Sequence, residues 1–227
     1  MAYSGEDLFR NYRKTYVISP FQASQVSPLG YDLRIGFAIT IKYPHPDQRG
    51  TLHKEMTRPA PDPTKPDDRP LGKLIVEPGE CILIVTVEQI YLSSKVLGTV
   101  QAKASHAVQG LFLNPVTVDP NFGSRQDASG RLILFMHNAS GRRLTLTEKQ
   151  GVATLIMHEV STETLHLPEK TGFENVLSAL SDTYEKSVIE RISAYTKNYI
   201  DKRGKTEFVR DRQAVQNLRA NTHQGTH

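Results

Sequence analysis

The amino-acid sequence predicts a mainly β fold, a β-sandwich or jelly-roll barrel, followed by one long C-terminal α-helix. Two patterns indicate this class. In the middle of the chain, short apolar stretches alternate with turn residues, as they do in all-β domains. Towards the end, apolar residues repeat every three or four positions, as on one face of a helix. A length of 227 residues suits one large domain with an appendage.

The first long strand is expected between Tyr31 and Tyr43, after a short helical pattern within residues 1–20. Its apolar residues occupy every second position, as in a strand with one buried face; they are Leu33, Ile35, Phe37, Ile39 and Ile41. The next stretch, residues 44–72, is rich in proline and charge and has very few apolar side chains. Such a composition cannot build a core, so we predict a long surface excursion.

A series of short strands is predicted between residues 73 and 159, because glycine-, proline- and asparagine-containing turns separate short apolar runs there. The expected strands are Ile75–Glu77, Cys81–Glu88, Leu97–Ala104, Val116–Val118, Leu132–His137 and Val152–His158. On the strand that starts at Leu132, alternate residues face opposite sides, so Ile133, Phe135 and His137 share one face. We assign residues 1–165 to this β domain.

Residues 166–204 are predicted to hold an amphipathic helix between Phe173 and Ile200. Its apolar stripe comprises Phe173, Val176, Leu177, Leu180, Tyr184, Val188, Ile192, Tyr195 and Tyr199. A stripe of this length needs cover, either from its own domain or from the same helix of another subunit, and the sequence leaves both open. Residues 205–227 are expected to form a polar tail.

Composition excludes several classes of protein. The longest apolar run, Cys81–Val87, is too short for a membrane span of about 20 residues. Residues 1–13 lack the apolar core of a secretory signal, so we expect a cytosolic protein. The single cysteine, Cys81, cannot form an internal disulfide or a Cys-rich zinc site, and we interpret it as a small buried hydrophobe. A net charge of +4 fits a phosphate-bearing ligand better than a nucleic acid, and no membrane partner is expected.

Common catalytic motifs are also absent from the sequence. There is no P-loop, no dinucleotide-binding glycine motif, no nucleophile elbow and no H-E-x-x-H zinc motif. A zinc nucleobase deaminase needs a C-x-x-C pair, which a single cysteine cannot supply. The usual templates of these enzyme classes are therefore excluded.

Several segments, taken in order, resemble the trimeric dUTPase and dCTP deaminase superfamily. The stretch Ile18-Ser19-Pro20-Phe21 and the run Val26-Ser-Pro-Leu-Gly-Tyr-Asp-Leu-Arg-Ile-Gly36 are similar to the opening of bacterial dCTP deaminases. Residues 102–111 resemble the family's phosphate segment, Gly-Arg-Ser-Ser-Leu-Ala-Arg-Leu-Gly-Leu. Residues 118–122 resemble Ile-Asp-Pro-Gly-Phe, residues 130–138 resemble Gly-x-Ile-x-Leu-Glu-Leu-x-Asn, and residues 152–155 stand where Ile-Ala-Gln-Leu is usual.

The resemblance implies a β-rich homotrimer with pockets at subunit interfaces. It implies a deoxynucleoside triphosphate ligand, a pyrimidine in preference, with magnesium bound through the nucleotide phosphates. In the deaminases a glutamate moves protons between water and the pyrimidine, and in the dUTPases the aspartate of the Ile-Asp segment helps to position the attacking water. Carried over to this sequence, the candidate catalytic residue is Asp119. The candidate nucleotide-binding residues are Lys103, Ser105, Asp119, Phe122, Phe135 and Thr154, and no metal ligand is assigned.

The sequence departs from the family pattern at several of these positions. Phe135 stands in the place of the deaminase glutamate, and its ring cannot exchange a proton. Lys103 replaces the first arginine of the phosphate segment and keeps the charge without the bidentate geometry. Val108 replaces the last arginine of that segment, and Thr154 replaces the usual glutamine. The glycine-rich C-terminal arm of the dUTPases has no counterpart in residues 220–227.

Each candidate also has a structural interpretation. Asp119 precedes a proline and could be a turn residue only, and Asp32 could be a buried strand carboxylate with a structural partner. Lys103 and Ser105 are expected to alternate on one face of a strand, where both could meet phosphate oxygens or merely line a solvated edge.

Three functions remain open from the sequence. The first is a nucleotide-binding trimer that has lost the deaminase carboxylate and acts in nucleotide-linked regulation or assembly. The second is an active dCTP deaminase or dUTPase-type hydrolase whose general base comes from elsewhere, His106 or His137 in principle. The third is a structural assembly module.

Overall fold

The computed structural model describes residues 1–60, 70–123, 130–163 and 172–198. A capping box starts the first helix, since the side chains of Ser4 and Asp7 each accept a hydrogen bond from the other residue's backbone amide. The elements are α1 (Gly5–Asn11), β1 (Tyr16–Ser19), the 3₁₀ turn η1 (Ala23–Gln25), β2 (Val26–Ser27), β3 (Gly30–Lys42), β4 (Thr51–Glu55), β5 (Lys73–Val76), β6 (Cys81–Leu92), β7 (Val96–Ala102), α2 (Ala104–Ala107), β8 (Leu111–Leu113), β9 (Val116–Val118), β10 (Arg131–Asn138), β11 (Leu144–Thr147), β12 (Gly151–Glu159), α3 (Gly172–Thr183) and α4 (Lys186–Asn198).

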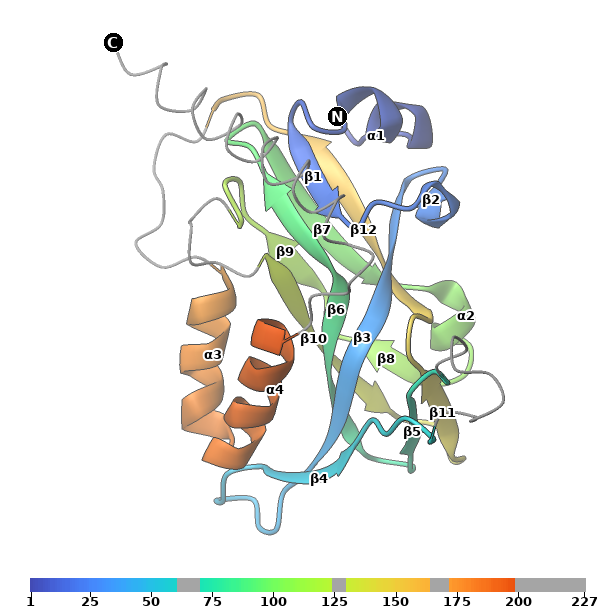
Figure 1. Ribbon diagram of the computed structural model, residues 1–227, viewed down its shortest axis with the longest axis vertical. Helices are drawn as coiled ribbons and strands as arrows, with labels where there is room; N and C mark the ends of the chain where they lie inside the picture. Colours follow the sequence, from blue (N-terminus) through green and yellow to red (C-terminus); the bar gives the residue numbers. More distant parts are fainter. Residues whose placement is uncertain (61–69, 124–129, 164–171, 199–227) are drawn as a thin grey trace.

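Most strands belong to one curled sheet with the order β8-β10-β6-β3-β12-β7-β9, and β5 pairs with β11 in a separate ribbon (Figure 1). β3 joins the two halves of the sheet. Its first residues, from Tyr31 to Arg34, pair with β12, and its later residues, from Ile35 to Ile41, pair with β6. A register shift between Ile35 and Phe37 marks the change, and such irregularities bend a strand. The predicted mainly β class is confirmed, and every strand expected between residues 73 and 159 is present, most of them with shifted ends.

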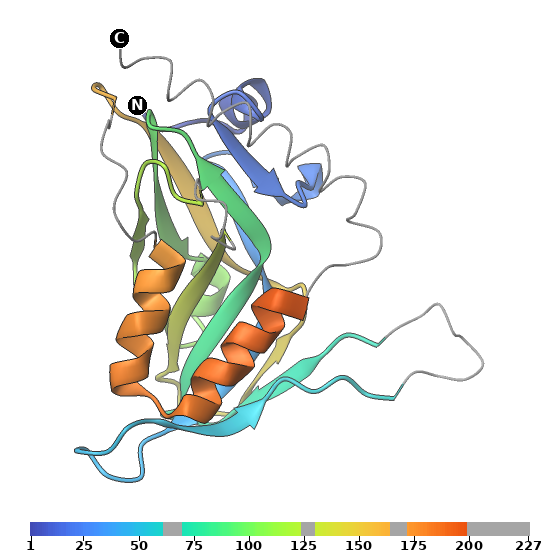
Figure 2. The same cartoon turned by 60° about the vertical axis from the view of Figure 1, so that its left-hand side comes forward.

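Two apolar clusters lie on opposite faces of the central strands. The main core takes alternate residues such as Leu132, Leu134 and Met136 of β10. The second cluster takes the residues between them, and it joins the sheet to the last two helices through Ile39, Ile41, Leu83, Val85, Ile133, Leu180, Tyr184, Val188 and Ile192. Figures 1 and 2 show α3 and α4 side by side against this face of the sheet. The chain's own domain therefore covers the stripe between Leu180 and Tyr195. Cys81 is only partly buried, at the edge of the second cluster.

The C-terminal stripe forms two helices where the sequence predicted one. The break falls at Tyr184 and Glu185, where the backbone of Gly50 takes part in two hydrogen bonds. The Gly50 amide donates to the carbonyl of Thr183 at 2.9 Å, and the Glu185 amide donates to the carbonyl of Gly50 at 2.9 Å. These long-range bonds replace helical ones, so the axis changes direction while the buried face stays continuous. The residues beyond 198 lie outside the described part of the chain. Among the helices that the structure describes, none is long and apolar enough to span a membrane.

The proline-rich excursion is more closely tied to the fold than its composition predicted. Residues 51–55 form β4, which pairs with the end of β3. Leu52 packs against the second cluster, and Met56 packs against the main core. The sequence from Thr51 to Glu55 lacks proline, so all its backbone amides are able to donate to a sheet. Residues 61–69 lie outside the described part of the excursion.

Candidate functional site

The carboxylate of Asp32 contacts two of the predicted nucleotide-binding residues, Lys103 and Thr154. Asp32 lies on β3 directly opposite Thr154 of β12, and the Thr154 hydroxyl donates to Asp32 Oδ1 at 2.8 Å. Lys103, which follows β7, forms an ion pair with Asp32 Oδ2. All three side chains are partly accessible, so this cluster, which we call the Asp32 cluster, is open to solvent. The structural partner expected for the Asp32 carboxylate is present.

The expected strand geometry of Lys103 and Ser105 is wrong. β7 ends at Ala102, Lys103 caps the short helix α2, and Ser105 lies exposed within that helix. The helical bonds are local, because the amide of Ala107 donates to the Lys103 carbonyl at 3.1 Å and that of Val108 to the Ala104 carbonyl at 3.0 Å. Two-residue alternation therefore does not apply to this pair. Ser105 nevertheless follows Lys103, a member of the Asp32 cluster, by only two residues in the sequence.

His106 has a structural role on the same short helix. It is 5% exposed, and its Nε2 atom bonds to the backbone carbonyl of Gly151 at 2.9 Å. This contact ties α2 to the start of β12, beside Lys103. Val108, which replaces a family arginine, is 84% exposed.

Asp119 lies away from the Asp32 cluster. Val118 of β9 is paired with Gly98 of β7, whereas Lys103 follows the opposite end of β7. At about 3.3 Å per residue, Asp119 and Lys103 are separated by roughly 20 Å along the strand. Asp119 is exposed, and its carbonyl accepts the Phe122 amide at 3.1 Å in a turn. The turn interpretation of Asp119 thus holds for its backbone, while its carboxylate is accessible.

Phe122 is buried in the main core, with 8% of its surface exposed. Its carbonyl accepts the amide of Leu92 at 3.0 Å, which fixes the turn after β9 to the end of β6. Within one chain the ring therefore packs against core residues and is not displayed to a ligand at the surface.

Phe135 lies in the middle of β10, opposite Leu83 of β6. The predicted alternation is correct, because Ile133 and Phe135 join the second cluster while Leu134 lies in the main core. The ring is partly buried on the face that α3 and α4 cover. His137 is two residues further on and is exposed. The residue that stands at the position of the family glutamate is therefore apolar, and so are the side chains around it.

A buried ion pair that the sequence analysis missed lies next to the Asp32 cluster on β3. Arg34 Nε donates to Glu88 Oε1 at 2.6 Å, and its backbone amide donates to Glu88 Oε2 at 2.9 Å. Arg34 Nη1 also donates to the side chain of Gln22 at 2.6 Å. Burial raises the pKa of Glu88, against the opposing effect of the Arg34 charge and its hydrogen bonds. The sequence contains a signal for this pair, because Arg34 and Glu88 each lie within a strand whose other residues are mostly apolar.

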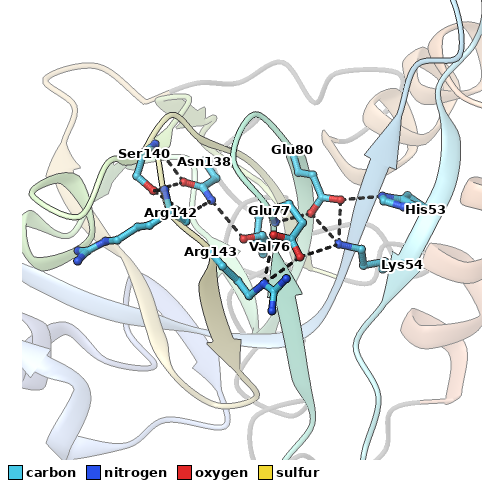
Figure 3. A network of polar contacts seen from close by, with 9 residues as sticks. All are labelled: His53, Lys54, Val76, Glu77, Glu80, Asn138, Ser140, Arg142 and Arg143. Atoms are coloured by element: carbon cyan, nitrogen blue, oxygen red, sulfur yellow. Dashed lines mark hydrogen bonds and ion pairs between the residues drawn. The ribbon is translucent and has the colours of Figure 1, made fainter.

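A second polar network holds the end of β10. Asn138, which matches the asparagine of the family segment, is fully buried. Its side-chain Nδ2 donates to the backbone carbonyls of Val76 and Arg142. Its Oδ1 accepts from the backbone amide and the hydroxyl of Ser140. Figure 3 shows this group beside a charged cluster in which His53 and Lys54 of β4 meet Glu80, while Arg143 meets Glu77. These contacts join the turns after β5 and β10 and stabilise the strand that carries Phe135.

In the part of the chain that the structure describes, no group of three or more His, Cys, Asp or Glu side chains could hold a metal ion. The Asp32 carboxylate is already paired with Lys103 and Thr154.

Comparisons with known proteins agree with the observed fold. A family model described as dCTP deaminase-like matches residues 3–160. A dCTP deaminase from Pyrococcus abyssi is 30% identical over 138 residues, which cover 61% of this chain and 73% of the relative. One from Pyrococcus furiosus is 31% identical over 134 residues, covering 59% and 69%. The crystal structure of 2′-deoxycytidine 5′-triphosphate deaminase from Agrobacterium tumefaciens aligns with a TM-score of 0.50 at 12% identity, covering 69% of this chain and 47% of that one. Helices α3 and α4 follow the residues that the family model matches.

Proposed function

Because the chain belongs to the dCTP deaminase-like family, we propose that it binds a pyrimidine deoxynucleoside triphosphate and does not deaminate dCTP. The observation that carries this proposal is Phe135. Its ring occupies the position of the family glutamate and packs into the apolar cluster beneath the C-terminal helices. General acid–base catalysis typically contributes about 10² to 10⁴ in rate, and a phenyl ring can neither accept nor donate the proton.

The surroundings of Phe135 support the same conclusion. Val108, at the position of the arginine that ends the family's phosphate segment, is exposed and uncharged. His106 is engaged with the Gly151 carbonyl. His137 faces the same side as Phe135 but lies at the exposed end of β10. Neither histidine is therefore placed as a substitute base at the position of Phe135.

The nucleotide-binding part of the proposal starts from the Asp32 cluster. Lys103, Ser105 and Thr154 supply a cation and two hydroxyls near one accessible edge, a combination that suits phosphate oxygens. Asp119 meets the same nucleotide only when a neighbouring subunit supplies it, which is one reason to propose a homotrimer. Magnesium enters with the nucleotide phosphates. Phe122 and Phe135 support the site by packing, Phe122 in the main core and Phe135 in the second cluster. The protein serves nucleotide-linked regulation or assembly in the cytosol.

Thermal denaturation with dCTP or dUTP and magnesium tests the binding. A ligand at 100 times its dissociation constant adds about 2.7 kcal/mol of stability, so a clear rise in midpoint is expected. The variant Lys103→Met should weaken this effect, whereas Lys42→Met, which removes an exposed lysine at the far end of β3, should not. The absence of any shift with every deoxynucleotide would contradict the proposal and favour an assembly module.

The release of ammonia from dCTP tests the missing activity. We expect no turnover from the unmodified protein, and none from Phe135→Glu, because the new carboxyl would lie in an apolar cluster and stay protonated. Turnover above about 0.1 per second, already slow for an enzyme, that is lost in Asp119→Ala would show that the active-enzyme alternative is correct.

A further inference from the structure

The ring of Tyr195, on the last turns of α4, sits in a slot on the sheet. A Cβ atom built on Gly36 would lie 2.2 Å from the Tyr195 hydroxyl oxygen and 3.0 Å from Cζ of the ring. Phe37 stacks on the ring with centroids 5.2 Å apart and an interplanar angle of 16°. The guanidinium carbon of Arg131 lies 5.7 Å from the ring centroid. We call the space between Gly36, Phe37 and Arg131 the ring slot.

The walls of the ring slot belong to the sheet. Arg131 is 4% exposed, and its Nη1 atom donates to the carbonyls of Thr86, at 2.7 Å, and Val87. Gly36 and Phe37 lie at the register shift of β3, which is fixed by pairing with β6. These bonds are made within the sheet and do not involve the Tyr195 ring.

Tyr195, by contrast, comes after the residues that anchor α4. Val188 and Ile192 are fully buried in the second cluster, and Arg191 forms an ion pair with Glu55 at 3.3 Å. Tyr195 also packs against the second cluster, but it is only partly buried. Displacing this ring alone therefore exposes less apolar surface than undocking the whole helix would.

The ring slot adjoins the position of the family glutamate. Phe37 of β3 and Ile133 of β10 both pair with Val85 of β6, one from each side. Phe135 is two residues beyond Ile133 and also belongs to the second cluster. Phe37, in the wall of the slot, is therefore level with Ile133 on the sheet. Phe135 lies two residues further along β10, on the same face.

We propose that the ring slot is a binding site for a pyrimidine base, and that Tyr195 fills it in the free protein and is displaced by the base. This inference rests on the proposed nucleotide binding. The slot offers an aromatic face, an arginine and bare backbone, the surfaces on which nucleobases stack. Because a single six-membered ring fills it, a pyrimidine fits better than a purine. Tyr195 then acts as an internal competitor that lowers the apparent affinity for nucleotide by the fraction of chains in which the slot is closed.

Two substitutions with opposite expected effects test the inference on the full chain. Isothermal titration with dCTP, dUTP, dATP or tripolyphosphate, each with magnesium, gives the affinities. Tyr195→Ala should bind dCTP or dUTP at least ten-fold more tightly than the unmodified protein. Gly36→Ala, whose methyl group would occupy the slot, should weaken that binding at least ten-fold. Tripolyphosphate, which has no ring, should bind all of these proteins alike. The control Phe112→Ala, which removes an exposed ring on β8 outside the slot, should leave the affinities unchanged.

The outcomes separate the inference from the proposed function. Nucleotide binding that neither substitution alters, or that changes equally in Phe112→Ala, would overturn the ring slot and leave nucleotide binding in place. A failure of every protein to bind any nucleotide would overturn both. Should Tyr195→Ala fail to fold, hydrogen exchange on the unmodified protein provides the second measurement. Saturating dCTP should speed exchange in residues 193–198 at least ten-fold without changing β6, and unchanged exchange there would contradict the displacement.

Discussion

At the scale of single residues, the ion pair between Arg34 and Glu88 is the most consequential buried interaction outside the apolar clusters. The side chain of Arg34 is 6% exposed and that of Glu88 is 0% exposed. Replacing Glu88 with alanine leaves the guanidinium buried with no carboxylate, so we expect the free energy of unfolding to fall by about 3–5 kcal/mol. Urea denaturation measures this. Glu77→Ala, which breaks the exposed pair with Arg143, is the control and should cost about 1 kcal/mol or less; equal losses would contradict the expectation.

Glu148 supplies a pH-dependent contribution at the same scale. Burial opposes its ionisation, but hydrogen bonds from Arg58 at 2.6 and 2.9 Å and from the Gly72 amide at 2.9 Å outweigh this and lower its pKa. A carboxyl whose folded-state pKa is lowered stabilises the protein above its unfolded pKa, about 4.3, and loses that contribution as the pH falls through the folded value. The unmodified protein should therefore lose more stability than Glu148→Gln between pH 5 and pH 3, as measured by urea denaturation. Parallel pH profiles would refute this.

At the scale of elements, the pairing of α3 and α4 with the sheet decides whether the β domain is stable alone. Deleting residues from Pro168 onward would uncover Ile39, Leu83 and Val85, which are nearly or fully buried beneath these helices. Each such side chain contributes about 1.5–3 kcal/mol when buried, so the truncated chain should be insoluble or strongly destabilised. Removing only residues 205–227 is the matched control. A soluble and equally stable truncation at 168 would show that the stripe serves an external partner instead.

At the scale of the whole molecule, the separation of the candidate residues predicts a homotrimer. The Asp32 cluster and Asp119 lie near opposite ends of β7, so one chain does not assemble the candidate site. Light scattering or sedimentation at micromolar concentration should give three times the mass of one chain. A monomer would remove the shared pocket and the roles proposed for Asp119 and Lys103 together.

The sequence alone determined the elements with a strong period. The alternation from Leu33 to Ile41 and the apolar runs around Ile84 and Ile133 predicted strands that are present, because the two-residue period of side chains follows from the extended backbone. The faces of β10 were likewise predicted correctly, which placed Phe135 on the side opposite Leu134. The order of the short motifs also identified the family, although no single motif is specific.

Only the tertiary structure decided the features that depend on distant residues. The break at Tyr184 comes from hydrogen bonds with Gly50, and the pairing of Arg34 with Glu88 joins two strands far apart in the chain. The short helix after Ala102 replaced the end of an expected strand because its bonds compete locally with a sheet. The ring slot joins residues of β3 and β10, and the ring that fills it comes from α4. Sequence periodicity reports local geometry, whereas these contacts depend on which distant segments the folded chain brings together.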